Sequence, residues 1–242
     1  MAKKVIEIKD LTYTYPDGMQ ALRDVKLDVF EGESVGVIGP NGAGKSTLLL
    51  HLNGILGGNS QVQILEMEPT EENLPRIRAK VGLVFQDPDD QLFMPTVFED
   101  VAFGPLNMGL SEGRVRDLVK KGLEVVGMEA STDRTAHHLS YGEKKRIAIA
   151  TVLSMEPAIL ALDEPSGNLD PMSRRNLIRL LQSFDNVTKI VATHDLELVL
   201  ELCERVMVLD RGEVIAFGNT KELLSDELLM ESHGLAVPLS LL

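Results

Sequence analysis

The stretch Gly39-Pro40-Asn41-Gly42-Ala43-Gly44-Lys45-Ser46-Thr47 decides how this chain folds. It fits the pattern G-x-x-x-x-G-K-[ST], which is typical of a phosphate-binding loop. Upstream, residues 34–38 form a short β-branched run bounded by glycine, which predicts a buried strand. Downstream, residues 48–52 predict an apolar helix that stops near Asn53-Gly54. Because strand, glycine loop and helix are the context that the motif requires, we expect the chain to bind a nucleoside triphosphate.

The residue types of this loop suit the binding of an anion. Gly39, Gly42 and Gly44 permit backbone angles that bring successive N–H groups toward one phosphate. The helix that begins near Gly44 adds the positive end of its dipole at the same place. Lys45 can reach β- and γ-phosphate oxygens, and the Ser46 hydroxyl can complete a Mg²⁺ shell. The alternative is a glycine-rich turn that binds nothing, which the complete motif disfavours.

Composition limits the class of protein. The chain has 242 residues, enough for one large α/β domain or for a domain with an inserted subdomain. Its 44% hydrophobic and 25% charged residues are ordinary for a globular protein with a core. A net charge of −13 argues against nucleic acid as the main partner. The single cysteine, Cys203, excludes an internal disulfide, fits a reducing cytosol and is expected in the core.

No segment resembles a targeting signal or a membrane span. Residues 5–10 alternate as a strand does, unlike the apolar core of a signal peptide. The longest apolar region, residues 147–162, is interrupted by Glu156-Pro157 and is too short to cross a bilayer. Any membrane role is therefore expected to come through a partner.

The order of strand and helix patterns predicts an α/β fold with a mostly parallel sheet. Residues 5–33 predict strands joined by a turn at residues 16–18, and residues 96–155 are helical throughout. The other predicted strands are residues 61–66, 81–85, 158–162, 189–193 and 206–209, and the other predicted helices are residues 74–80, 171–182 and 196–202. The helical stretch therefore looks like an insert within the α/β domain.

Asp163 and Glu164 follow a buried strand without interruption. In a phosphate-loop fold we expect this strand to run beside the one that feeds the loop, with the aspartate orienting Mg²⁺. A second carboxylate beside it can accept a proton from an attacking water. The alternative is a solvated acidic turn, which the buried strand makes less attractive.

Residues 139–146, Leu-Ser-Tyr-Gly-Glu-Lys-Lys-Arg, precede another apolar helix. Ser140 is a natural N-cap, and Glu143 completes a capping box. Capping alone could explain both residues. The functional interpretation is a second helix N-terminus that presents N–H groups and a hydroxyl to an anion.

Tyr15 and the five histidines could each have either a structural or a functional role. Tyr15 lies just before the first turn and is either a strand aromatic or a stacking face for adenine, with nothing in its position to decide. His194 follows a predicted strand of the sheet directly, where open α/β sheets bind ligands. Structural roles are expected of the other histidines, which are His51, His137, His138 and His233.

Together these motifs make the chain resemble the ATP-binding subunits of ABC transporters over nearly its whole length. The matching segments are the Walker A loop at residues 39–47, Gln86 of the Q-loop, the signature at residues 139–146, Walker B at residues 159–164, the D-loop at residues 166–170 and the switch His194. The resemblance implies a single ABC ATP-binding domain over residues 1–242 with a small antiparallel β subdomain. It also implies a helical subdomain at about residues 88–156 and a C-terminal extension at about residues 223–242.

The resemblance further implies a head-to-tail dimer that closes over two ATP molecules. Glu164 would be the general base, His194 would contact the γ-phosphate, and Asp170 would join the two sites. The implied Mg²⁺ residues are Ser46, Gln86 and Asp163. The implied ATP contacts are Tyr15 on adenine, Gly39, Pro40, Asn41, Gly42, Ala43, Gly44, Lys45, Ser46 and Thr47 on the phosphates, and Ser140 and Gly142 on the partner's ATP.

The signature departs from the usual Leu-Ser-Gly-Gly-Gln of this family at two places. Tyr141 replaces the first glycine, and Glu143 replaces the glutamine. Gly142, which is expected to approach phosphate by its backbone, is retained. Glu143 adds negative charge near a nucleotide unless a neighbouring cation offsets it. These changes argue against fast turnover and leave the family assignment intact.

A narrower resemblance, carried by residues 81–93 and 101–107, is to cobalt-type and energy-coupling-factor importer ATPases. It implies a peripheral protein at the cytoplasmic face of the membrane, bound to an integral coupling subunit and a substrate-binding membrane subunit. The partner ATPase would be a second copy or a relative. Phe93, Met94, Val97 and Phe98 are either an apolar seat for a membrane-subunit helix or packing within the insert. The alternatives are a soluble ABC ATPase acting on DNA or ribosomes, and a nucleotide-gated binding module with little hydrolysis.

Overall fold

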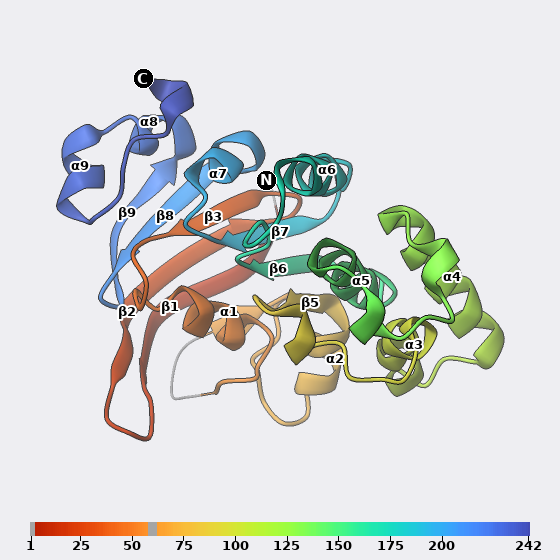
Figure 1. The fold of residues 1–242 in the computed structure, drawn as a ribbon. Coiled ribbons are helices and arrows are strands. Elements are labelled where there is room, and N and C mark those ends of the chain that lie inside the picture. The colour runs from red at the N-terminus through yellow and green to blue at the C-terminus, as the bar shows by residue number, and fades with distance from the viewer. Residues whose placement is uncertain (1–2, 58–61) are drawn as a thin grey trace.

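The computed structural model describes residues 3–57 and 62–242 (Figure 1). The strands are β1 (Lys4–Thr14), β2 (Gln20–Phe30), β3 (Ser34–Ile38), β4 (Val62–Ile64), β5 (Val81–Val84), β6 (Ile159–Asp163), β7 (Thr188–Ala192), β8 (Arg205–Asp210) and β9 (Glu213–Asn219). The α-helices are α1 (Lys45–Leu52), α2 (Leu74–Lys80), α3 (Val97–Asn107), α4 (Glu112–Val126), α5 (Tyr141–Leu153), α6 (Pro171–Gln182), α7 (Leu196–Leu202), α8 (Thr220–Leu224) and α9 (Glu227–Ser232). Short 3₁₀ turns are η1 (Pro88–Asp90), η2 (Glu129–Ser131), η3 (Ala136–His138) and η4 (Leu239–Leu241).

The central sheet has the strand order β5-β6-β7-β3-β8-β9 within the described residues. Its first five strands are parallel, and β9 pairs antiparallel with β8. The predicted α/β class with a mostly parallel sheet is therefore confirmed. The expectation that β6 runs beside β3 is wrong, because β7 lies between them. Strand order depends on where each crossover helix returns the chain, and the local sequence pattern does not carry that information.

The parallel register still brings the expected residues to one edge. In the β3–β7 pair Val37 is opposite Ala192, and in the β6–β7 pair Asp163 is opposite the same alanine. The strands that feed the phosphate-binding loop, the acidic pair and His194 therefore end almost level. This carboxyl edge is where open α/β sheets bind ligands.

Alternation along the strands divides the core into two clusters. In β6, Leu160 and Leu162 pack with the cluster that includes α4, α5, α6 and α7. The intervening Ile159 and Ala161 pack with the cluster that includes α1 and the small sheet of order β2-β1-β4. The central-sheet strands β3, β5, β6 and β7 are buried on both faces, which is why they read as continuous apolar runs. Figure 1 shows α6 and α7 on one side of the sheet and α1 on the other.

The described elements between β5 and β6 are helices and 3₁₀ turns (Figure 1). α3 begins with a capping box formed by Thr96 and Glu99, which fixes its first turn. Val97 is fully buried in the core that these helices share, so of the two alternatives left open for it, packing within the insert is the correct one. Helical spacing sends Val97 and Val101 to the same inner face, whereas Phe93 precedes the helix and is 62% exposed.

The chain after β8 holds elements that the sequence patterns did not predict. β9 reverses beside β8, and α8 and α9 follow it. The predicted strand at residues 61–66 is shorter in the structure, as β4, and its first residue lies outside the described residues. Across residues 3–57 and 62–242, a helix with the length and apolarity needed to cross a membrane is not found. Cys203 is buried, and burial raises the pKa of its thiol, as expected for a core cysteine.

The inward face of α4 provides a test of the helical core. Leu123 is 1% exposed, and we expect Leu123→Ala to lower the free energy of unfolding by about 2–5 kcal/mol because it leaves a cavity. Val125 on the same helix is exposed, and Val125→Ala should change the free energy of unfolding by less than about 0.5 kcal/mol. Urea denaturation of the two variants measures the difference. Equal losses would contradict the described packing of α4.

Candidate active site

The loop between β3 and α1 packs tightly against the end of β8. Gly39 has φ +151°, and a Cβ there would lie 1.9 Å from the carbonyl oxygen of Leu209. Gly44 is the left-handed N-cap of α1, and its Cβ would lie 2.5 Å from the carbonyl oxygen of Ala21. Larger residues at these two positions would displace backbone. The glycines thus allow the loop to follow the sheet edge closely.

Lys45 lies inside this loop. Its side chain is 7% exposed, and Nζ donates to the carbonyl oxygens of Gly39 at 2.9 Å and Pro40 at 3.1 Å. Burial lowers the pKa of Lys45, while the charges of Glu164 and Asp163 act in the opposite direction. The ammonium group is therefore held within the loop by main-chain oxygens.

The carboxylate of Asp163 has the properties expected of a cation ligand. Asp163 is buried, and its Oδ1 has no hydrogen-bond partner among the described residues. Burial raises the pKa of Asp163, the Ser46 side chain acts to lower it, and the charge of Glu164 raises it further. Carboxylate and hydroxyl oxygens are ligands that Mg²⁺ prefers. An unpaired buried oxygen beside a serine hydroxyl therefore fits a bound Mg²⁺ ion.

Glu164 and His194, which are far apart in sequence, meet at the sheet edge. His194 Nδ1 lies 2.8 Å from Glu164 Oε2, and the Thr193 hydroxyl donates to the same oxygen at 2.9 Å. The His194 N–H donates to Oε1 at 3.1 Å. Glu164 itself has φ +42°, a left-handed conformation that is strained for this residue. The carboxylate is thus fixed in place, while the imidazole is 68% exposed to solvent.

Gln86 follows β5 and is exposed. Its carbonyl oxygen accepts hydrogen bonds from Lys145 Nζ at 2.6 Å and from the Tyr141 hydroxyl at 3.2 Å, both of which belong to α5. Lys145 is 1% exposed, and burial lowers its pKa to about 8 despite the nearby carboxylates of Asp163, Asp87 and Glu164. The sequence patterns indicated this lysine only as one of the cations that could offset Glu143. It stands in the charged run Glu143-Lys144-Lys145-Arg146, so its residue type alone did not distinguish it from its neighbours.

Ser140 caps α5 as predicted. Its hydroxyl accepts from the N–H of Glu143 at 3.4 Å, and Glu143 Oε2 accepts from the Ser140 N–H at 2.8 Å. The capping box is therefore confirmed. Hydrogen bonds that the Ser140 hydroxyl and the Ser140 N–H donate to the carboxylate lower the pKa of Glu143, whose Oε1 also lies 3.8 Å from Arg134. Gly142, in the same turn, approaches α6 so closely that a Cβ would lie 3.2 Å from the hydroxyl oxygen of Ser173.

The D-loop region is connected to the segment that holds His194. Asp170 caps α6 by accepting from the N–H groups of Met172 and Ser173. Four residues later, Arg174 binds both carboxylate oxygens of Asp195, at 2.7 and 2.9 Å. Burial opposes ionisation of Asp195, but bonds from Arg174, Leu198 and Ser166 outweigh it and lower its pKa. Sequence reasoning missed Asp195 and Arg174, although Asp195 directly follows the histidine that it singled out.

Tyr15 is attached to the helix of the phosphate-binding loop. Its hydroxyl lies 3.0 Å from Thr47 Oγ1, and its ring meets Tyr13 edge to face at 5.0 Å. Tyr13 in turn meets the buried ring of His51, whose Nδ1 bonds the Thr47 carbonyl oxygen at 2.8 Å. Tyr15 thus lies beside the loop, where a base attached to bound phosphates can reach it.

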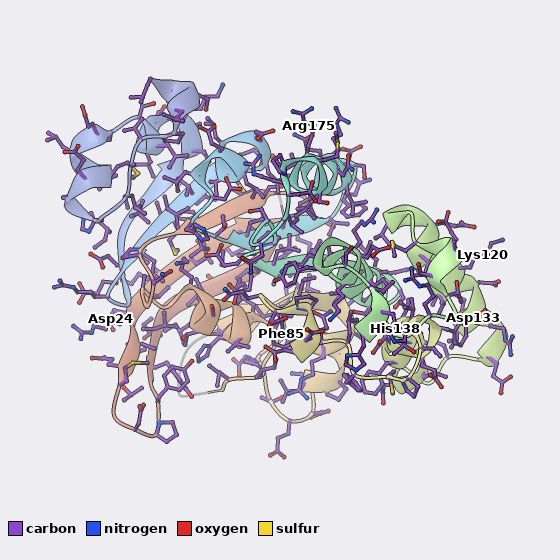
Figure 2. The ribbon with its side chains drawn as sticks, in the orientation of Figure 1. Asp24, Phe85, Lys120, Asp133, His138 and Arg175 are labelled. Carbon is purple, nitrogen blue, oxygen red and sulfur yellow. The ribbon has the colours of Figure 1, made fainter. Side chains whose placement is uncertain are left out.

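The remaining histidines lie elsewhere. His137 and His138 form part of η3, and Figure 2 labels His138 among the helices α3 to α5. His233 Nδ1 lies 2.9 Å from Asp210 Oδ2, which fastens α9 to the end of β8.

The family model described as ABC transporter matches residues 22–167, more than half of the chain. That span includes the loop, Gln86, the capped signature helix and the Asp163–Glu164 pair. The chain belongs to the ABC transporter family. It is an ATP-binding cassette and an ATPase, and the predicted resemblance is confirmed.

Relatives of this ABC ATPase point to the narrower group. The energy-coupling factor transporter ATP-binding protein EcfA of Methanothermobacter thermautotrophicus is 50% identical over 97% of this chain and 77% of that protein. EcfA1 of Methanospirillum hungatei is 45% identical over 97% of this chain and 86% of that protein. The described fold matches cbiO1 from Clostridium perfringens, part of the ABC transporter complex cbiONQ, with a TM-score of 0.83 and 38% identity over 95% and 94% of the two chains.

A second structural match concerns assembly. A dimeric ATP-binding cassette in a post-hydrolysis state with ADP and Pi has a TM-score of 0.81 and 29% identity, covering 89% of this ABC ATPase and 98% of that chain. That protein is similar in fold and is known as a dimer with nucleotide bound.

The unpaired oxygen of Asp163 allows a test of the magnesium assignment. Without nucleotide, Asp163→Asn should raise the melting temperature by about 2–4 °C, because a neutral amide is cheaper to bury than an unpaired carboxylate beside Glu164. With Mg²⁺ and ATP, the wild type should gain thermal stability and the variant should gain little. Asp117→Asn on the exposed face of α4 is the matched control and should follow the wild type. Equal stabilisation of both variants by Mg²⁺ and ATP would contradict the assignment.

Proposed function

We propose that this ABC ATPase is the ATP-hydrolysing subunit of an importer that takes up a metal ion, such as cobalt or nickel, or a vitamin. The main support is the similarity over almost the whole chain to energy-coupling factor ATPases, together with the fold shared with cbiO1. The proposal of a dimer is supported by the different positions of the two elements that we expect to bind phosphate. The loop that holds Lys45 is at the sheet edge, and the Ser140 cap is at the start of α5 in the helical region (Figure 1).

In the proposed mechanism two copies, or one copy and a related ATPase, close head to tail. Residues 39–47 of one subunit enclose the phosphates of ATP, and Tyr15 stacks on adenine. Ser140 and Gly142 of the other subunit complete the γ-phosphate site with N–H groups and a hydroxyl. One subunit alone binds ATP and hydrolyses it slowly, because half of the γ-phosphate site is missing.

The chemistry at the γ-phosphate uses groups that the sheet edge already orients. Glu164 takes a proton from the attacking water, and His194 contacts the γ-phosphate. Ser46, Gln86 and Asp163 would hold Mg²⁺, which would neutralise phosphate charge when bound. Asp170, at the start of α6, communicates with the opposite site. Since Glu164 is bonded to Thr193 and His194, proton transfer begins from a defined orientation of the carboxylate.

The membrane partner is proposed to bind in a groove of about 970 Å³ between the α/β core and the helical region. Its walls include the exposed side chains of Phe93, Phe103 and Met108, with Arg76 and Asp90 nearby. An apolar groove with charged margins suits a short amphipathic helix. The protein would then act at the cytoplasmic face of the membrane as a peripheral subunit beside an integral coupling subunit and a substrate-binding subunit.

The two alternative functions have less support. An ABC ATPase acting on nucleic acid or ribosomes conflicts with the net charge of −13 and with the importer relatives. A nucleotide-gated binding module was suggested by the altered signature. Tyr141 donates a hydrogen bond to the Gln86 carbonyl oxygen, and Glu143 accepts one from the Ser140 N–H. Since both residues have structural roles, their presence does not by itself indicate an inactive site.

The dimer mechanism predicts the behaviour of Glu164→Gln. Removing the general base should lower the ATPase rate by at least about 100-fold while leaving ATP binding intact. The variant should elute as an ATP-bound dimer in size-exclusion chromatography. Glu124→Gln, on the exposed face of α4, should hydrolyse ATP as the wild type does. A persistent monomer together with an inactive wild type would favour the binding-module alternative.

The groove predicts which substitutions separate ATP chemistry from membrane assembly. Phe103→Ser should reduce recovery of integral membrane protein with the purified ATPase at least about fivefold, because it removes an apolar anchor of about 1–2 kcal/mol. Leu228→Ser on α9, where the leucine is 83% exposed, should leave that recovery unchanged. The measurement is co-purification from detergent-solubilised membranes. Recovery of ribosomes or nucleic acid without any integral membrane protein would contradict the importer proposal.

A further inference from the structure

Tyr141 and Lys145 of the signature helix both reach the main chain of the Q-loop. We propose that they are positioning residues that hold the Gln86 carbonyl and thereby couple the two ATP sites of the dimer within one chain. The proposal rests on the proposed function, in which Gln86 serves the chain's own ATP and Ser140 serves the partner's. Tyr141 is also the residue at which this signature departs from the usual pattern.

The two contacts come from one face of α5. Tyr141 and Lys145 are four residues apart and therefore lie one turn from each other. Lys145 Nζ donates to the Gln86 carbonyl oxygen at 2.6 Å and to that of Phe85 at 3.3 Å. The Tyr141 hydroxyl donates to the same Gln86 oxygen at 3.2 Å. Figure 2 labels Phe85 near β5, next to the helical region.

The neighbouring residues of this segment are bound to α5 as well. Lys144 Nζ lies 2.7 Å from Asp89 Oδ1, and Gln91 Nε2 donates to the Ala148 carbonyl oxygen at 2.8 Å. Gln91 Oε1 also accepts from the Phe85 N–H at 3.1 Å. Because residues 85–91 are attached to α5 at both ends and in the middle, a rigid shift of α5 carries Gln86 with it.

The burial of Lys145 needs an explanation beyond packing. An ammonium group that is 1% exposed pays a large desolvation cost, which its main-chain acceptors and the nearby charges of Asp163, Asp87 and Glu164 offset. An apolar side chain of the same length would fill the space without that cost. The ammonium group can donate a hydrogen bond to the Gln86 carbonyl oxygen, which an apolar side chain of the same length cannot do.

The arrangement has a mechanical consequence. When the partner's γ-phosphate binds at the N-terminus of α5, the helix is drawn toward it. Through the hydrogen bonds from Lys145 and Tyr141 to its carbonyl oxygen, Gln86 then moves relative to the ATP site of its own chain. Binding of the partner's ATP at the signature helix is thus transmitted to the chain's own ATP site through Tyr141 and Lys145.

The test is a double-mutant cycle on the purified full-length ATPase. Lys145→Met should lower kcat by about tenfold and change KM for ATP by less than about twofold, because it displaces a catalytic group without touching ATP. Gln86→Ala should lower kcat as well. The double variant should be no more than about twofold slower than the slower single variant, because both changes disable the same step. Multiplicative losses, or a Lys145→Met enzyme with wild-type kcat, would overturn the proposal.

Further variants separate positioning from folding. Lys120→Met makes the same charge change on α4, at an exposed lysine whose partner is Glu124, and should keep kcat within about twofold of the wild type. Lys145→Arg retains donors and should recover part of the lost rate. Tyr141→Phe removes a single hydroxyl at a half-buried position and should lower kcat by about threefold without changing the melting temperature by more than about 2 °C.

The failure of this proposal can be told apart from failure of the proposed function. In the Glu164→Gln background, Lys145→Met should still form the ATP-bound dimer, because neither Lys145 nor Tyr141 is assigned to bind nucleotide. If the Glu164→Gln protein forms the dimer and Lys145→Met prevents it, Lys145 acts in dimer closure and the positioning role is wrong. If Glu164→Gln alone fails to form a dimer, the head-to-tail mechanism itself is wrong.

Discussion

The alignment of three parallel strands is the constraint on which the site depends. Val37 of β3, Ala192 of β7 and Asp163 of β6 are neighbours across the sheet, so the segments that follow these strands leave from one edge. Backbone hydrogen bonds in a buried sheet fix this register, and a slip by one residue would turn each side chain to the opposite face. Lys45, Glu164 and His194 are brought together by main-chain pairing before any of their side chains interact.

Local sequence was sufficient for the elements of this edge but insufficient for their arrangement. The glycines of the loop, the apolar runs and the capping pattern at Ser140 each act over a few residues, and all of them formed as expected. The position of β7 between β3 and β6 depends on long crossovers, which no short pattern records. The role of Val97 stayed open for a similar reason, since its apolar type does not say which face of α3 is covered by α4 and α5. Lys145 and Asp195 were missed because their partners are main-chain or charged groups distant in sequence.

Several buried polar groups at this site carry costs that packing alone would avoid. Asp163 has an unpaired oxygen among the described residues, Glu164 has a left-handed backbone, and Lys145 holds a positive charge within the core. Natural sequences break local rules mainly where function requires it. Asp163, Glu164 and Lys145, which break these rules, lie around the same sheet edge. Their chemistry is consistent with a site that binds a nucleotide and a divalent cation.

The capping box at Ser140 has a consequence for the proposed dimer. The Ser140 hydroxyl donates to Glu143 Oε2 at 2.7 Å, so its proton already has an anionic acceptor. In the proposed head-to-tail dimer, a phosphate from the opposite subunit would have to take this proton donor from Glu143. The carboxylate would then act as an internal substitute for that phosphate, and closure would exchange one anion for another. The balance between open and closed forms of the proposed dimer would depend on this competition at the helix cap as well as on the nucleotide.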